Sequence, residues 1–193
     1  MKSRVIGIVG CLFVAILSSC IGGSDEGSGS TAIGDRAPKF SLKALDGTTV
    51  SSSSLEGNLV ILNFWATWCE PCLKEIPDLK QVAASSGAKV VGIALDEDGM
   101  KSVKPFVDSH GINYTVLLGD QDLFQRFNGL GIPYTLVLDR AQRVVKIYRG
   151  PTTRESLEQD LKETEKGHVS SLGGPLLAPG GREQRDSVAR RSF

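Results

Sequence analysis

The stretch Leu59–Trp65 is almost entirely apolar and has the length of a β-strand rather than of a helix. A strand without alternation of polar and apolar residues is typical of a sheet that is buried on both faces. Shortly after it, apolar residues recur at helical spacing from Pro71 to about Ala84, and Pro77 is expected to kink this helix. A buried strand that leads through a short loop into a helix indicates an α/β fold.

Similar patterns alternate along the rest of the chain. Strands are predicted at Phe40–Ala44, Thr48–Val50, Lys89–Leu95, Tyr114–Leu118, Tyr134–Leu138 and Val144–Tyr148, and helices at Asp98–His110 and Asp120–Phe127. Thr152 and Glu155 match a capping box, which predicts the start of the last helix. With 40% apolar residues the chain can bury one core, so we expect a single domain over residues 33–167 with helices on both faces of a sheet.

The sequence Trp68-Cys69-Glu70-Pro71-Cys72 joins the buried strand to the helix. A cysteine at a helix N-terminus faces unpaired N–H groups and the positive end of the helix dipole, and both favour the thiolate. Cys69 is therefore the predicted nucleophile. Cys72 lies one turn later, where it can attack a mixed disulfide on Cys69, so it is the predicted resolving thiol. Pro71 suits the first turn, where its missing N–H leaves no hydrogen bond unmade.

The residues around the cysteines refine this prediction. Glu70 places a negative charge beside Cys69, which disfavours the thiolate and argues against a strongly oxidising enzyme, so the pair is predicted to act as a reductant. For Trp68 the sequence leaves open whether the side chain packs or contacts substrate. A zinc site needs four ligands, and the two histidines, His110 and His168, have no ligand-like spacing, so no metal is expected.

Residues 1–19 have the features of a signal peptide. Two basic residues precede the apolar run Val5–Leu17, which is too short to span a hydrocarbon core about 30 Å thick. The sequence that ends in Ser19-Cys20 resembles a bacterial lipobox, so Cys20 is predicted to become the lipidated first residue of the mature protein. Cleavage near Ser19 by an ordinary signal peptidase and a retained anchor are the alternatives.

After removal of the signal peptide, both ends of the chain contain few apolar residues that could be buried in a core. Residues 20–32 are rich in Gly, Ser, Asp and Glu and are predicted to form a flexible tether, and residues 168–193 are predicted to be disordered. Removal of the signal peptide also removes Cys11, which leaves Cys69 and Cys72 as the free thiols. A disulfide across two residues closes too short a loop to stabilise much, so redox chemistry explains this pair better than structural cross-linking.

The segment Asn63–Cys72, followed by Glu75 and Pro77, resembles the membrane-anchored thioredoxin-like reductases of the TlpA/ResA type, including those that serve cytochrome c maturation. The resemblance begins at Gly34–Phe40 and continues to about the last helix. It implies a thioredoxin-like three-layer α/β/α sandwich with an N-terminal hairpin and an inserted strand–helix element around Lys89–His110.

The resemblance also implies roles for residues outside the cysteine motif. Proteins of this type carry a cis-proline at the position of Pro133, in a loop that faces the cysteines and pairs with the substrate backbone, although the sequence alone favours an ordinary trans proline. Glu75 matches a glutamate near the cysteines that can exchange a proton with them. Asn63 stands where thioredoxin has a buried aspartate, and because asparagine takes up no proton, that task would pass to Glu75. The predicted substrate-contacting residues are Trp68, Glu70, Pro71, Ile132 and Pro133.

The predicted function is that of an envelope thiol–disulfide reductase that needs no cofactor beyond its Cys69–Cys72 disulfide. The resemblance implies protein disulfide clients, among them the CxxCH segment of an apocytochrome c, and a membrane thiol donor of the DsbD or CcdA kind. The lipid on Cys20 would hold the protein on a bacterial membrane, facing the periplasm or another extracytoplasmic space.

Other functions fit the sequence less well. Gly34–Leu45 also resembles the opening of peroxiredoxins, but those proteins carry a threonine three residues before the reactive cysteine, whereas Thr67 is two residues before Cys69. Copper-carrying lipoproteins of this fold space their cysteines CxxxC and add a distal histidine. Equal numbers of basic and acidic residues, 22 of each, without a basic stripe argue against nucleic-acid binding.

Overall fold

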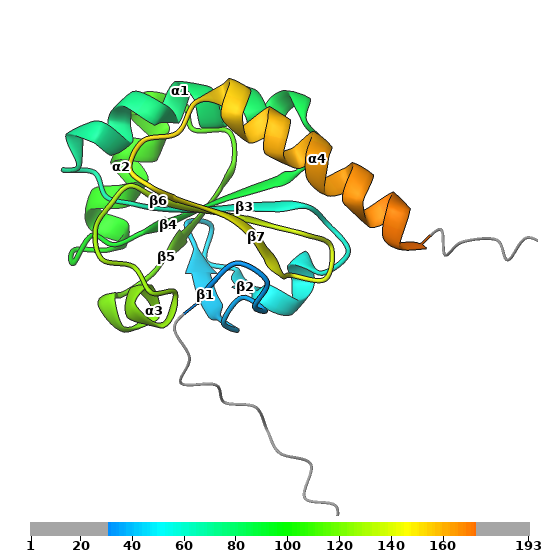
Figure 1. The fold of residues 1–193 in the computed structure, drawn as a ribbon. Coiled ribbons are helices and arrows are strands. Elements are labelled where there is room, and N and C mark those ends of the chain that lie inside the picture. The colour runs from blue at the N-terminus through cyan, green and yellow to red at the C-terminus, as the bar shows by residue number, and fades with distance from the viewer. Residues whose placement is uncertain (1–30, 173–193) are drawn as a thin grey trace, which may run out of the picture.

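The structure is a computed structural model, and it describes residues 31–172 (Figure 1). Its strands are β1 (Ser41–Ala44), β2 (Thr49–Ser51), β3 (Val60–Trp65), β4 (Lys89–Ala94), β5 (Thr115–Leu118), β6 (Tyr134–Leu138) and β7 (Val144–Arg149). Its helices are α1 (Glu70–Ser85), α2 (Met100–His110), α3 (Gln121–Arg126) and α4 (Arg154–Leu172), with a 3-10 helix η1 (Ser52–Leu55). Each predicted strand and helix is confirmed to within a few residues. The predicted signal peptide, Cys20 and most of the tether lie outside the described residues, as do residues 173–193.

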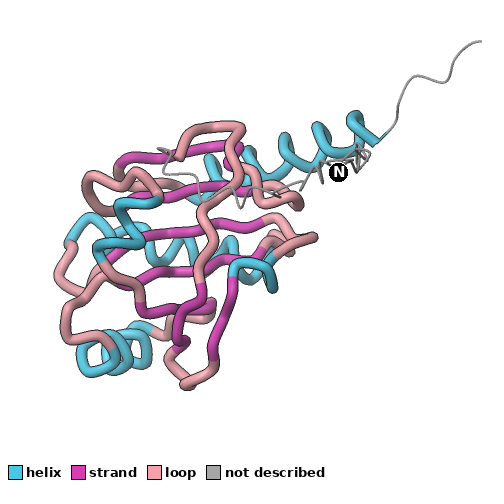
Figure 2. Tube along the Cα trace, turned by 90° about the horizontal axis from the view of Figure 1, so that it is seen from below, coloured by secondary structure: helices cyan, strands magenta, loops and turns pink. Residues whose placement is uncertain are grey.

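The seven strands form one mixed sheet in the order β2-β1-β5-β4-β3-β6-β7. Strand β3 is parallel to β4 and antiparallel to β6, and β5 is parallel to β4 on its other side. Helices α1 and α4 lie on one side of the sheet and α3 on the other (Figure 1), and α4 extends past the sheet edge (Figure 2). The predicted three-layer α/β/α architecture with an N-terminal hairpin is confirmed. The segment Lys89–His110, expected as an insertion, contributes β4 to the middle of this sheet.

Strand β3 contributes side chains to an apolar cluster on each face of the sheet, because successive side chains of a strand point to opposite faces. Val60, Leu62 and Phe64 are fully buried in one cluster with residues of α3, and the Phe64 ring lies 5.2 Å from that of Phe124. Ile61 belongs to a second cluster with residues of α1 and α4. This burial on both faces fixes the end of β3, from which the cysteine-containing loop starts.

The last helix differs from the prediction at both ends. Helix α4 begins at Arg154, and the hydroxyl of Thr153 accepts the N–H of Ser156 at 3.3 Å, so the capping residue is Thr153 and not Thr152. Thr152 instead directs its N–H and its hydroxyl to a buried carboxylate described below. The helix continues to Leu172, so the first residues of the predicted disordered tail are helical, because each added residue of a helix gains one further hydrogen bond.

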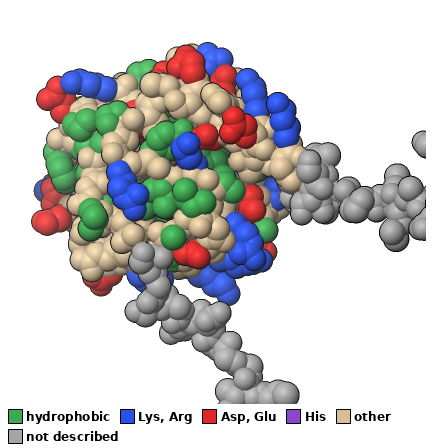
Figure 3. Space-filling model, in the orientation of Figure 1, with side chains coloured by type: hydrophobic (Ala, Val, Ile, Leu, Met, Phe, Trp, Pro, Cys, Tyr) green, Lys and Arg blue, Asp and Glu red, His purple; other side chains and the backbone are tan. Residues whose placement is uncertain are grey.

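The surface carries charges of both signs. On the face shown in Figure 3, basic and acidic side chains are interspersed around a central apolar area. This agrees with the equal numbers of basic and acidic residues in the sequence. Within residues 31–172, no helix combines the length and the apolar character that a membrane span requires.

Candidate active site

Cys69 and Cys72 form a disulfide at the N-terminal end of α1, with their Cα atoms 5.3 Å apart. Cys69 is the residue that precedes the helix, and the Leu73 N–H donates to its carbonyl at 3.1 Å. The Cys69 N–H donates to the carbonyl of Ala66 at 3.1 Å, which closes a turn between β3 and α1. Both sulfurs therefore lie at the positive end of the helix dipole, as the sequence predicts.

The two cysteines differ in their access to solvent. Cys69 is 5% exposed and Cys72 is fully buried. A thiol–disulfide exchange needs access to the attacked or attacking sulfur, and of these two residues only Cys69 retains any exposed surface. The predicted order, with Cys69 as nucleophile and Cys72 as resolving thiol, agrees with this difference in burial.

The residues beside the cysteines line the surface around the disulfide. Trp68 is 70% exposed, in contrast to Trp65, which is 1% exposed, so Trp68 is not a core residue. The Glu70 carboxylate pairs with Lys74 Nζ at 3.1 Å, and both side chains are largely exposed. Pro71 is exposed in the first turn of α1. This exposure argues against the packing alternative for Trp68, whereas its contact with substrate stays a prediction.

The loop before β6 lies next to the disulfide. The Ile132–Pro133 peptide bond is cis, as the resemblance predicts. Ile132 packs against the apolar cluster that contains both Cys69 and Cys72. The cis peptide Ile132–Pro133 and the disulfide, 60 residues or more apart in the sequence, therefore share one surface.

A buried polar cluster lies beneath the cysteines and is centred on Glu75, which is 2% exposed. Asn63 Nδ2 donates to Glu75 Oε1 at 2.6 Å and also to Thr135 Oγ1 at 2.9 Å. The backbone N–H of Thr152 donates to Glu75 Oε2 at 2.9 Å, and its hydroxyl donates to the same oxygen at 3.3 Å. Strand β3 and the loop before α4 thus meet at one carboxylate of helix α1, and strand β6 joins the cluster through Asn63.

The environment of Glu75 favours its protonated form. Burial raises the pKa of the Glu75 carboxyl, while the hydrogen bonds from Thr152 and Asn63 lower that pKa in part, and the nearby charge of Asp78 raises it again. Glu75 follows Cys72 by three residues, so both lie on one face of α1. A buried carboxyl with a raised pKa, one helical turn from a cysteine, is suited to take up and release a thiol proton.

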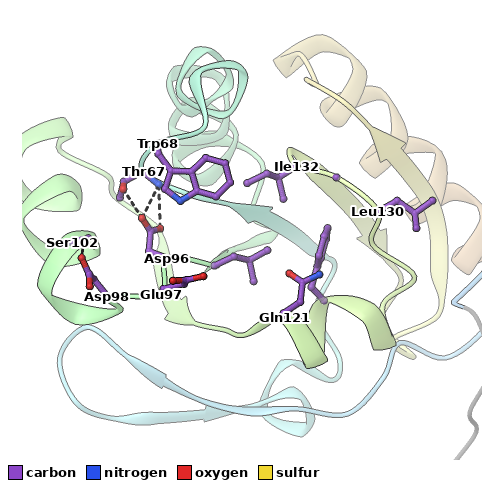
Figure 4. A pocket seen from close by; sticks show the side chains of 12 residues that line it. Thr67, Trp68, Asp96, Glu97, Asp98, Ser102, Gln121, Leu130 and Ile132 are labelled. Atoms are coloured by element: carbon purple, nitrogen blue, oxygen red, sulfur yellow. Dashed lines mark hydrogen bonds between the residues drawn. The ribbon is translucent and has the colours of Figure 1, made fainter.

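A pocket of about 600 Å³ opens beside the disulfide, with Trp68 and Ile132 on one side (Figure 4). Asp96, Glu97 and Asp98, which follow β4, form an acidic wall of the same pocket, and Asp96 lies next to Thr67 and Trp68 (Figure 4). The pocket joins an apolar side at the cis-proline loop to an acidic wall.

Sequence reasoning did not identify several members of this site, namely Thr135, Thr152 and Asp96. Thr135 lies opposite Asn63 in the β3–β6 ladder, so a correct strand pairing would have placed it there. Asp96 binds Thr67 from 29 residues away, and no local pattern signals such a contact.

Among residues 31–172, no group of three or more His, Cys, Asp or Glu side chains is arranged to hold a metal ion. His110 stacks on Phe106, with ring centroids 3.8 Å apart.

Comparisons with known proteins agree with this geometry. Residues 32–164 match the Redoxin family. The thiol-disulfide oxidoreductase ResA of Bacillus subtilis is 31% identical over 148 residues, which cover 75% of this chain and 82% of ResA. A thiol:disulfide interchange protein of the thioredoxin family from Chlorobium tepidum is 37% identical, with a TM-score of 0.61 over 70% of this chain and 99% of that one. A secreted thiol-disulfide isomerase from Corynebacterium glutamicum is 25% identical, with a TM-score of 0.60 over 67% of this chain and 85% of that one.

Together the fold, the Cys69–Cys72 disulfide and these relatives define a thioredoxin-like thiol–disulfide oxidoreductase. Within that class, the chain belongs to the redoxin family and to its ResA-type oxidoreductases. The activity resides in the cysteine pair, which exchanges between a disulfide and a dithiol.

Proposed function

We propose that the protein works as a disulfide reductase on extracytoplasmic protein clients. The observation that carries this proposal is the disulfide at the N-terminus of α1, next to the cis-proline loop and to an exposed tryptophan. The Glu70 carboxylate at the first position of α1 opposes the positive helix end that stabilises a thiolate. A less stabilised thiolate makes the reduced pair a better electron donor.

The reaction transfers two electrons from the cysteine pair to the client. The Cys69 thiolate attacks one sulfur of the client disulfide, which forms a mixed disulfide and releases the other client sulfur as a thiolate that takes up a proton. Cys72 then loses its proton and attacks the Cys69 sulfur. This step re-forms the Cys69–Cys72 disulfide and releases the client in its dithiol form.

In this scheme Glu75 accepts the proton of Cys72. The buried Cys72 thiol has no access to solvent, so its proton needs an internal acceptor. Burial raises the pKa of Glu75, which brings the basicity of its carboxylate closer to that of a thiolate and favours proton exchange between the two. Asn63 and Thr152 hold the carboxylate oxygens, so they would orient Glu75 without taking up the proton themselves.

The protein would act outside the cytoplasm, attached to a bacterial membrane through lipid on Cys20. Support comes from the signal-like residues 1–19 and from the similarity to a secreted isomerase. A reductant in an oxidising compartment needs a source of electrons, and a membrane thiol transporter of the DsbD or CcdA kind would supply them. The clients would be proteins with an exposed disulfide, with an apocytochrome c in cytochrome c maturation as the specific candidate.

The reduction potential of the Cys69–Cys72 pair tests the direction of the reaction. Equilibration with glutathione buffers, followed by thiol labelling, gives the potential of the purified domain. We expect a value close to the roughly −270 mV of thioredoxin. A value close to about −120 mV, which belongs to a strong oxidant of this fold, would instead mean that the protein oxidises client thiols to disulfides.

A further inference from the structure

Asp96 lies at the carboxyl end of β4, and its side chain points to the loop that precedes the cysteines (Figure 4). The residue is 8% exposed. Its two carboxylate oxygens accept the backbone N–H of Thr67 at 3.2 and 3.1 Å, and Oδ1 also accepts the Thr67 hydroxyl at 2.5 Å. Thr67 therefore directs both of its hydrogen-bond donors to one buried carboxylate.

Thr67 is a central residue of the turn that ends at the nucleophile. The hydrogen bond from the Cys69 N–H to the carbonyl of Ala66 makes Thr67 and Trp68 the two middle residues of this turn. The turn lies between β3 and α1, outside the ladder of the sheet and the hydrogen bonds of the helix. Holding Thr67 thus limits where Trp68 and the Cys69 sulfur can lie.

The backbone around Asp96 is itself fixed on both sides. The Leu95 N–H donates to the carbonyl of Trp65 at 2.9 Å, which extends the β3–β4 ladder up to Asp96. The Asp96 carbonyl accepts the N–H of Gly99 at 3.0 Å, in the turn that leads to α2. A side chain whose backbone is fixed in this way can hold a neighbouring residue, here Thr67, in one geometry.

We propose that Asp96 is a positioning residue for thiol–disulfide exchange, which holds the turn of Thr67, Trp68 and Cys69 in the arrangement that a protein client requires. Asp96 acts through Thr67 and not by contact with a sulfur. A protein client must fit the exposed indole, the cis-proline loop and the sulfur at the same time, whereas a small disulfide needs only the sulfur. Loss of the contact should therefore slow exchange with a protein more than exchange with a small disulfide. The inference rests on the exchange activity of the cysteine pair.

Four variants test this role: Asp96→Asn and Thr67→Val, and the controls Asp46→Asn and Thr67→Ser. Asp96→Asn removes the charge and one acceptor, and Thr67→Val removes only the hydroxyl donor while it keeps the shape and the backbone N–H. Asp46→Asn is the matched control, because Asp46 accepts the N–H and the hydroxyl of Thr48 at 2.9 and 2.6 Å in the β1–β2 turn. For each reduced variant, kcat/KM with insulin and the rate with oxidised glutathione are measured, together with the melting temperature.

We expect kcat/KM with insulin to fall about ten-fold in Asp96→Asn and less in Thr67→Val, since a misplacement of about 1 Å can slow a reaction by on the order of 10²-fold. The rate with oxidised glutathione should change by no more than about two-fold, because a small disulfide makes few of the contacts that orientation improves. Thr67→Ser, which retains both donors, should match the wild type, as should Asp46→Asn.

Equal losses with both disulfides, or no loss with insulin in a folded Thr67→Val protein, would overturn the role of Asp96. If Asp96→Asn fails to fold, the Thr67→Val and Thr67→Ser pair decides. A wild-type domain that exchanges with neither disulfide would instead refute the exchange activity itself, and the rates with oxidised glutathione separate the two cases.

Discussion

The side-chain amide of Asn63 donates a 2.6 Å hydrogen bond to the carboxylate of Glu75, which joins the middle of β3 to helix α1 beneath the disulfide. Both residues are almost completely buried. The amide can orient the carboxylate but cannot exchange its proton, so Glu75 remains the group of this pair that titrates. Glu75 therefore both connects β3 to α1 and is the group of this pair that can exchange a proton.

Glu75→Gln should change how stability depends on pH. Because burial raises the pKa of Glu75 in the folded protein, the unfolded chain loses this proton first as the pH rises. The free energy of unfolding of the wild type therefore falls as the pH increases from about 4.3, the pKa of an unperturbed glutamate, through the raised pKa of the folded state. Glutamine does not titrate, so this contribution is absent from the variant.

Urea unfolding of the two proteins between pH 4 and pH 8 measures this effect. At the acidic end we expect Glu75→Gln to be less stable by about 1 kcal/mol, because its amide group faces a donor. The difference in the free energy of unfolding between the wild type and the variant should narrow as the pH rises. Turnover of insulin should fall by on the order of 10²-fold, as is typical for loss of an acid–base group. The exposed Glu163→Gln on α4 serves as control. A constant stability difference across this range would contradict the raised pKa.

Trp68→Ala should weaken client binding without unfolding the protein. The indole is 70% exposed, so its loss should change the free energy of unfolding by no more than about 0.5 kcal/mol. We expect KM for insulin to rise by several-fold while the rate with oxidised glutathione stays the same, as steady-state kinetics can show. Ile33→Ala, which also removes an exposed apolar side chain, should alter neither quantity. An unchanged KM in Trp68→Ala would remove this indole from the client surface.

Gly92→Ala should destabilise the sheet near the buried polar cluster. Gly92 pairs with Asn63 across β3 and β4, and a Cβ atom there would lie 2.9 Å from Trp65 Nε1 and 3.1 Å from a ring carbon of Tyr114. The buried ring of Trp65 and the partly buried ring of Tyr114 must then shift, which costs about 1–3 kcal/mol. Thermal unfolding measures the loss. Gly167→Ala in α4, where a Cβ meets nothing within 4 Å, should instead stabilise by about 1 kcal/mol. Equal effects of the two substitutions would exclude the steric explanation.

Cys20→Ser should release the protein from the membrane. Stable anchoring needs about two acyl chains, and a lipidated cysteine provides them. In bacteria fed a clickable fatty acid, we expect label and membrane association for the wild type and neither for the variant. Cys11→Ser is the control, because the proposed cleavage removes this residue. Label that persists in Cys20→Ser, or a wild type without label, would refute the lipid anchor.

The sequence predicts local elements well here because their signals are local. The apolar run of β3 and the helical spacing after it identify the strand–loop–helix unit, and the cysteines fall at its joint. The capping prediction at Thr152 was wrong because Thr152 and Thr153 are adjacent and either residue type can cap a helix. Only the folded chain shows that Thr152 donates its N–H to Glu75 and that Thr153 caps the helix. The contact of Asp96 with Thr67 likewise depends on the pairing of β3 with β4, which brings together residues distant in the sequence.

The central claim is that Cys69 attacks the client and that Cys72 resolves the mixed disulfide. Incubation of reduced Cys72→Ser and Cys69→Ser proteins with insulin, followed by intact-mass analysis and peptide mapping, tests it directly. We predict a stable adduct through Cys69 in the Cys72→Ser protein, and neither adduct nor insulin reduction by the Cys69→Ser protein. A client adduct through Cys72, or insulin reduction at the wild-type rate by either variant, would contradict the account.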